Sequence, residues 1–256
     1  MSKILSRIKD IIPLTMLVLS LILIFVPLPI MLIQALIVIN IGFSLCLFLS
    51  KFFNNTAIAY YFPQLILYSS IYTCGIAIAT TRTFLTIPTL EGHIPLVLII
   101  GQWICRENYI CGFFTTLMMC SSLLMFCKLH IQRTQEVAAR FCLDRMSQKL
   151  LDIDKQVAQH YITAEEGNEQ RLKIQNQPSY YSSMDGSAKF LMGTIVAFAI
   201  LFGVAAVGGT GTGILNLNMP WQDALNQYIM LSSGYLVLFV IPLFLTSLGF
   251  KTSKLE

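Results

Sequence analysis

Uncharged apolar segments alternate with polar ones along this chain and predict helices that cross a bilayer. The candidates are residues 11–25, 30–50, 62–81, 109–127, 190–207 and 228–250. A crossing helix needs roughly 17–25 mainly apolar residues, which four segments supply outright and the first and fifth supply only with their flanks. A shorter apolar run at 94–105 predicts an interfacial or re-entrant piece. The pattern predicts an all-α, polytopic integral membrane protein with about six transmembrane helices.

The polar stretch between the fourth and fifth segments has a helical period of its own. Apolar residues recur at spacings of four and three, on a face opposite the charges: Ala139, Leu143, Met146, Leu150, Ile153 and Val157. This heptad-like seam is typical of an amphipathic helix. Thr163 and Glu166 then have the spacing of a capping box, so we expect a second helix that ends before Pro178.

These elements divide the chain into three regions. Residues 1–127 form an N-terminal membrane region of about four spans with an outer interfacial segment, and residues 128–189 form a helical loop. Residues 190–256 form a C-terminal membrane hairpin, which we expect to turn through a flexible glycine-rich outer loop at 208–213.

Charge sets the orientation of these regions. Only 12% of the residues are charged, about half the share of a soluble domain. In the six-span arrangement, fifteen of the 17 Lys and Arg residues lie on one side, all except Arg82 and Arg106. Basic residues stay on the cytoplasmic side of a membrane. We therefore expect both termini and the central loop to be cytoplasmic, and the net charge of +4 to reflect this topology instead of nucleic-acid binding.

The chain carries no pattern of catalytic or metal-binding residues. Its 7 cysteines lie mostly inside apolar segments without a CxxC pair, and its 3 histidines are isolated from them. Buried free cysteine behaves as a small apolar residue. No Ser-His-Asp, Cys-His or paired-carboxylate set is evident either, so the sequence predicts neither an enzyme nor a cofactor or metal site.

The densest group of charges is at residues 134–154, TQEVAARFCLDRMSQKLLDID. Glu136, Arg140 and Asp144 follow one another at four-residue spacing, which stacks them on one helix face as an alternating ladder. Lys149 and Asp154 continue the group.

This segment resembles the signature loop of the FHIPEP family, the integral-membrane export-gate proteins of flagellar and type III secretion systems. A second specific likeness is Met184-Asp185-Gly186 with Lys189-Phe190 and Gly193. Supporting likenesses extend the resemblance over nearly the whole chain, at residues 26–29, 40–41, 44, 62–63, 80–82, 101, 108, 112, 241–242 and 247.

The resemblance implies a subunit of a protein-export gate in the bacterial inner membrane. Such a protein would form a ring-like homo-oligomer beside other export-apparatus membrane subunits. The positions that the resemblance marks for interaction and assembly are Arg82, Glu136, Arg140, Asp144, Lys149, Asp154, Asp185 and Lys189.

The chain departs from the family pattern where the family carries charge inside its spans. Gln34, Thr73, Thr194 and Tyr235 stand where the family has an acidic residue, an arginine and two aspartates. The family also continues with two more spans and a large cytoplasmic domain after the position of Glu256. Because only ionisable groups relay protons inside a membrane, we expect assembly without independent proton coupling. A small-solute channel or carrier, or a non-transporting family remnant, is the alternative.

Overall fold

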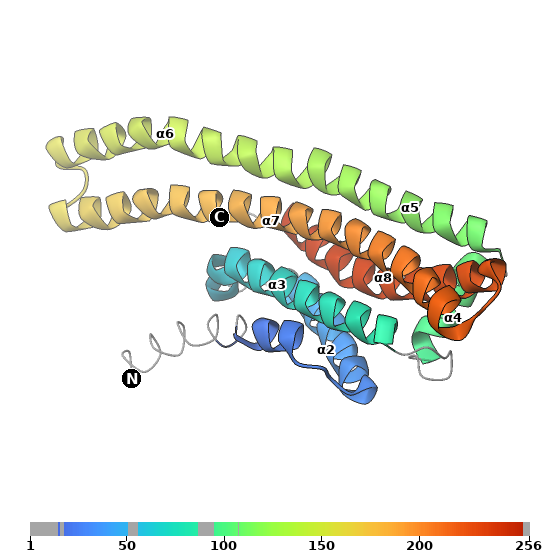
Figure 1. The fold of residues 1–256 in the computed structure, drawn as a ribbon. Coiled ribbons are helices and arrows are strands. Elements are labelled where there is room, and N and C mark those ends of the chain that lie inside the picture. Colours follow the sequence, from blue (N-terminus) through green and yellow to red (C-terminus); the bar gives the residue numbers. More distant parts are fainter. Residues whose placement is uncertain (1–14, 16–17, 51–55, 87–94, 107, 253–256) are drawn as a thin grey trace.

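The computed structural model describes residues 15, 18–50, 56–86, 95–106 and 108–252, and within these ranges the chain is helical with no strand (Figure 1). The elements are α2 (Ile30–Leu49), α3 (Thr56–Thr86), α4 (Pro95–Cys105), α5 (Tyr109–Phe126), the π-helical turn η3 (Cys127–Gln132), α6 (Arg133–Ala158), α7 (Ala164–Leu217) and α8 (Trp221–Thr252). The prediction of an all-α fold is confirmed.

Five helices in the described ranges are long and apolar enough to cross a membrane. They contain Ile30–Leu49, Tyr61–Thr86, Tyr109–Ala158, Ala164–Leu217 and Trp221–Gly249. The predicted first span at 11–25 lies partly outside the described residues, within which residue 15 and residues 18–25 are helical. This helical piece packs closely on α3, because a Cβ atom added to Gly75 would lie 3.1 Å from the carbonyl oxygen of Ser20.

Two predicted helix ends are wrong, and both lie in α7. The helix does not stop before Pro178 but continues as one element from Ala164 to Leu217. An internal proline removes a single backbone hydrogen bond and adds a local clash. Packing of α7 along α6 and then along α3 and α8 holds the helix together on both sides of that defect.

The predicted glycine-rich outer loop is also part of α7. The glycines between 208 and 213 are helical, and none has a positive φ angle. Two of them meet an aromatic ring: an added Cβ would lie 2.4 Å from a Tyr228 ring carbon at Gly209 and 2.6 Å from another at Gly213. These glycines therefore serve close packing of α7 on α8. The turn comes later, where Asn218 adopts a left-handed conformation with φ 50°.

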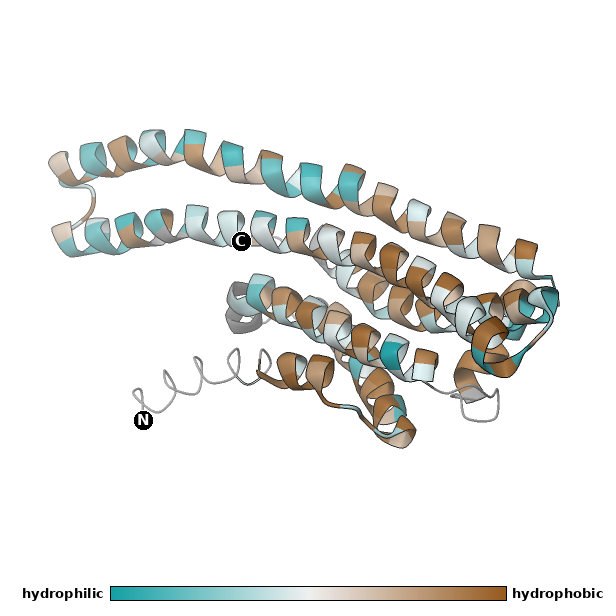
Figure 2. Ribbon diagram, viewed as in Figure 1, coloured by the Kyte–Doolittle hydropathy of each residue, from teal (hydrophilic) through white to brown (hydrophobic). Residues whose placement is uncertain are grey.

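The helix pair α6–α7 projects beyond the rest of the molecule. Figure 1 shows α5, η3 and α6 as one long rod that runs antiparallel to α7 and extends past the end of α3. Hydrophilic residues concentrate on this extension, whereas the remaining helices are mostly apolar (Figure 2). We call α6 together with residues 164–189 the projecting hairpin. The polarity thus changes near the predicted region boundaries, while the helices run through them without a break.

The short helix α4 is held tightly against α8. A Cβ atom on Gly101 would lie 2.4 Å from the carbonyl oxygen of Met230, and one on Gly234 would lie 2.2 Å from that of Val97. The two backbones therefore touch directly, as they do where small residues line helix interfaces in membranes. The apolar run predicted as interfacial or re-entrant is thus an 11-residue helix fixed to the C-terminal span.

Candidate functional site

Four of the eight predicted site residues come together at the base of the projecting hairpin. On α6, a nitrogen of Arg140 lies 2.8 Å from a carboxylate oxygen of Glu136, and on α7 Lys189 lies 2.7 Å from Asp185. Lys189 also interacts electrostatically with Glu136 and Arg140 across the two helices. Both pairs follow i,i+4 spacing, so each helix presents its charges on one face. We call these four residues the charge cluster.

The predicted ladder is only partly formed. Glu136 and Arg140 pair as expected, but Asp144 makes no ion pair with any residue in the described ranges. Asp154 instead binds Arg171 of α7, with distances of 3.1 Å to Nε and 2.5 Å to Nη2. Sequence spacing does not identify Arg171, because its partner Asp154 is 17 residues away. Only the antiparallel pairing of α6 with α7 brings the two residues together.

The apolar seam of α6 is confirmed at five of its six predicted positions, which are buried or half-buried, and differs at Leu143. Leu143 keeps 55% of its surface exposed, and Cys142 lies closer to α7 in its place. Ile153 and Gln135 are the buried residues of this helix. The period alone could not separate neighbouring positions, because Cys142 and Leu143 both fit a seam with spacings of three and four.

The predicted capping box is confirmed at the tip of the hairpin. The Thr163 hydroxyl accepts a hydrogen bond from the backbone of Glu166, and the Glu166 carboxylate accepts one from the backbone N–H of Thr163 at 2.9 Å. The hydrogen bond from the Thr163 backbone lowers the pKa of Glu166, and the hydrogen bond with the Thr163 side chain lowers it further. The start of α7 is thus fixed by two reciprocal bonds.

The capping box predicts a pH-dependent stability of the hairpin tip. Because the folded pKa of Glu166 is lowered, its stabilising contribution is complete above the pKa of an unfolded glutamate and disappears as the pH falls through the folded value. The protection factors of the amides at residues 163–167, which correct the hydrogen-exchange rates for their intrinsic pH dependence, should therefore fall in acid. Glu166→Gln should abolish most of this pH dependence, whereas Glu169→Gln, an exposed neighbour outside the box, should retain it.

Two segments that carry the resemblance to the family are joined by a buried hydrogen bond. The Ser187 hydroxyl, on α7, lies 2.8 Å from the carbonyl oxygen of Pro63 on α3 and 2.9 Å from that of Ser183. Phe62 and Met184 beside them are almost fully buried. The charge cluster is consequently anchored to the membrane helices through the same stretch of α7 that carries Asp185 and Lys189.

Arg82 lies apart from the charge cluster and holds the end of the N-terminal helical piece. Its guanidinium donates to the carbonyl oxygens of Ile24 at 3.1 Å and Phe25 at 3.0 Å, and also to that of Val26. The last carbonyls of a helix lack partners within the helix, and a cation there also compensates the helix dipole. Arg82 therefore connects α3 to the turn that precedes α2.

The neutral residues that the resemblance aligns with charged positions of the family take part in packing and hydrogen bonding. Thr73 is buried and donates to the Asn40 side chain of α2 at 3.1 Å and to the carbonyl of Ser69 at 2.7 Å. Thr194 is buried and donates to the carbonyl of Phe190 at 3.0 Å. Asn40 thereby provides a polar attachment between α2 and α3.

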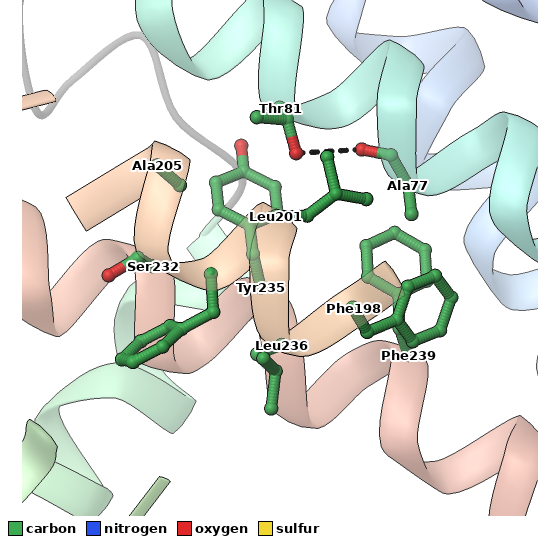
Figure 3. A pocket seen from close by; sticks show the side chains of 10 residues that line it. Ala77, Thr81, Phe198, Leu201, Ala205, Ser232, Tyr235, Leu236 and Phe239 are labelled. Carbon is green, nitrogen blue, oxygen red and sulfur yellow. Dashed lines mark hydrogen bonds between the residues drawn. The ribbon is translucent and has the colours of Figure 1, made fainter. Parts of the chain in front are cut away.

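Tyr235 lines a small cavity between α3, α7 and α8. Figure 3 shows its hydroxyl pointing toward Thr81, with Phe198 and Phe239 on the opposite side of the cavity. The ring of Tyr235 also packs edge-on against Phe84, with centroids 5.5 Å apart. The volume of about 30 Å³ corresponds to one water molecule.

Comparison with known proteins gives a match to the FHIPEP family over residues 20–250. The chain is 28% identical to a probable translocation protein y4yR of Sinorhizobium fredii, covering 93% of this chain and 34% of that protein. It is 29% identical to a flagellar biosynthesis protein FlhA of Bacillus subtilis, covering 93% and 35%. It is 31% identical to a hypersensitivity response secretion protein HrpI of Pseudomonas syringae, covering 86% and 32%. The chain thus spans about a third of the length of these relatives. No solved structure matches.

Proposed function

Because this chain belongs to the FHIPEP family, we propose that it is a membrane component of a type III or flagellar protein-export apparatus. The observation that carries the proposal is the charge cluster, where Glu136, Arg140, Asp185 and Lys189 converge from two segments that resemble the family. Relatives named for flagellar biosynthesis and secretion support it. The projecting hairpin and both termini then face the cytoplasm of a bacterial inner membrane.

The role in export is assembly without a proton path of its own. Thr73 and Thr194 are buried where the family carries charged side chains, and their hydroxyls are engaged by backbone carbonyls. A threonine hydroxyl does not titrate near neutral pH, so neither residue can carry a proton. The water-sized cavity beside Tyr235 likewise offers little support for a small-solute channel or carrier.

The export assignment predicts which proteins accompany the chain in its membrane. Tagged full-length chain, purified in mild detergent from the bacterium that encodes it, should bring along other export-apparatus membrane proteins. Arg140→Glu should reduce their recovery several-fold, because it replaces an ion pair with repulsion from Glu136. Lys155→Glu, the same charge reversal on α6 outside the cluster, should leave recovery unchanged. Purification without any export component would overturn the proposal.

Proton coupling is tested separately. In liposomes loaded with a pH-sensitive dye, the purified chain should collapse an imposed proton gradient no faster than empty liposomes do. The comparison is a double variant with Thr194→Asp and Tyr235→Asp. Any proton conductance that depends on carboxylates at these two positions should appear in this variant. Conductance by the native chain would contradict a purely assembling role.

A further inference from the structure

The rod formed by α5, η3 and α6 changes polarity along its length. Figure 2 shows mostly apolar residues along α5 and hydrophilic ones along α6. Within η3, Lys128 is 19 positions beyond Tyr109, the first residue of α5, and that length of helix rises about 28 Å. The hydrocarbon core of a bilayer is about 30 Å thick. Lys128 therefore lies at the end of the core, and Arg133 lies in the headgroup layer beyond it.

The π-helical turn places Lys128 and Arg133 on one face of the rod. The turn covers Cys127–Gln132. Hydrogen bonds in a π-helix join residues five positions apart, so these two cations stack one above the other. In an α-helix, five positions correspond to a rotation of about 140°, and the two side chains would point in different directions. The turn thus converts two separate cations into a pair.

This pair of cations has no acidic partner. Both side chains are exposed, and neither forms an ion pair within the described ranges. Residues 108–135 contain no acidic residue, and Glu136 already binds Arg140. On the neighbouring helices, Asp185 of α7 is bound to Lys189, and the second half of α8 contains no acidic residue. This face therefore carries a positive charge that an external anion can neutralise.

Exposed apolar side chains adjoin the two cations on the membrane side. Phe114, Met118, Met125 and Leu129 are all exposed and follow one another at spacings of four, seven and four residues. These spacings keep the four side chains on one face of the rod. In a membrane, that face contacts acyl chains. A molecule with an anionic head and apolar chains therefore matches the whole surface.

The height of this surface favours a lipid over a soluble anion or a protein segment. The cations lie at headgroup level and the apolar residues lie below it, so a lipid contacts both at once. A soluble anion would contact only the cations. Basic surfaces at the cytoplasmic ends of membrane helices attract anionic phospholipids. By contrast, Arg145 of the same rod is about 25 Å beyond Lys128, out of reach of any headgroup.

We propose that Lys128 and Arg133 bind one anionic phospholipid, with phosphatidylglycerol as the reference ligand, in the leaflet beside the projecting hairpin. The phosphodiester accepts hydrogen bonds from the ammonium group and from the guanidinium, whose two parallel donors match phosphate oxygens. The acyl chains lie along Met125 and Met118. Such a lipid fixes the height of the rod in the bilayer at the point where the projecting hairpin begins. The inference goes beyond the proposed export function and does not depend on it.

Photo-labelling tests this site on the full chain in liposomes. Phosphatidylglycerol and phosphatidylcholine analogues, each with a diazirine close to the glycerol backbone, are compared in otherwise identical liposomes. Mass spectrometry should find residues 125–133 labelled about fivefold more strongly, or more, by the anionic analogue. The exposed residues Leu96 and Trp103 of α4, at the other end of the spans (Figure 1), should be labelled equally by both. Equal labelling of residues 125–133 by the two analogues would overturn the proposal.

Paired substitutions provide the second arm of the test. Lys128→Gln together with Arg133→Gln should bring the labelling ratio close to one, while unchanged labelling of α4 shows that the fold is intact. Arg145→Gln together with Lys149→Gln removes the same charge from α6 beyond the reach of the headgroups, and it should leave the ratio unchanged. A preference for the anionic analogue that persists in the first double variant would contradict the proposal.

A competition experiment separates a lipid from a soluble anion. Glycerol 1-phosphate in large excess should not reduce labelling of residues 125–133, because it has the phosphate ester without the acyl chains that contact α5. Loss of labelling under these conditions would assign the two cations to a free phosphate ester, and the lipid site would be wrong.

Discussion

Gly234→Ala is expected to destabilise the protein by about 3 kcal/mol, although alanine is the better helix former. The new Cβ would lie 2.2 Å from the carbonyl oxygen of Val97 and 3.1 Å from the backbone nitrogen of Gly101. Both contacts are with backbone atoms, so no rotamer change relieves them and α4 must move away from α8. Overpacking of this kind typically costs 1–3 kcal/mol, with about 3 expected where two backbones collide.

Thermal unfolding in detergent measures this effect. The unfolding midpoint should fall by about 6 °C or more for a chain of this size. Gly203→Ala is the matched control, because an added Cβ there meets nothing within 4 Å. That variant should be neutral or stabilised by up to about 1 kcal/mol through helix propensity. Equal midpoints for the two variants would show that α4 does not rest on α8 as described.

Arg82→Leu is expected to release the N-terminal helical piece from α3. Three carbonyl oxygens, those of Ile24, Phe25 and Val26, lose their charged donor. Hydrogen bonds to a charged group contribute about 1.5–3 kcal/mol each at most. Arg82 is partly exposed, so we expect a local loss of about 2 kcal/mol. Hydrogen exchange at residues 18–26 should accelerate roughly thirtyfold, with little change in α7 or α8.

Two variants sharpen this measurement. Arg82→Lys should recover only part of the protection, because an ammonium group lacks the planar fork that reaches several acceptors. Arg106→Leu removes an equal charge from an exposed arginine whose side chain makes no hydrogen bond within the described ranges. It should leave exchange at residues 18–26 unchanged. Slow exchange in Arg82→Leu would show that the turn holds itself in place.

Sequence periodicity located the helices better than their ends. The apolar segments at 30–50 and 109–127 recur as α2 and α5 almost unchanged. The errors concentrate on Pro178 and on the glycines at 208–213, residues that disfavour helix locally. Both lie inside α7, where neighbouring helices provide the packing that overrides local preference. A propensity argument cannot include that contribution, because it depends on residues distant in sequence.

For the candidate site, the sequence identified residues but not their partners. The Glu136–Arg140 pair follows from spacing on one helix, and the capping box of Thr163 with Glu166 follows from a local pattern. The Asp185–Lys189 pair has the same spacing but was not predicted as an ion pair. The contact of Asp154 with Arg171 and the clamp of Arg82 on residues 24–26 do not. Those interactions join different helices, and no local sequence pattern specifies how two helices align along their length.

The sequence by itself determined the helical class, most apolar helices, the Glu136–Arg140 ion pair and the family motifs at 134–154 and 184–190. Each of these depends on residues within a few turns of one another. Only the tertiary structure decided that these motifs meet in one charge cluster and that α4 rests on α8 through Gly101 and Gly234. Those features arise from helix packing, which positions residues far apart in sequence at distances that periodicity alone does not specify.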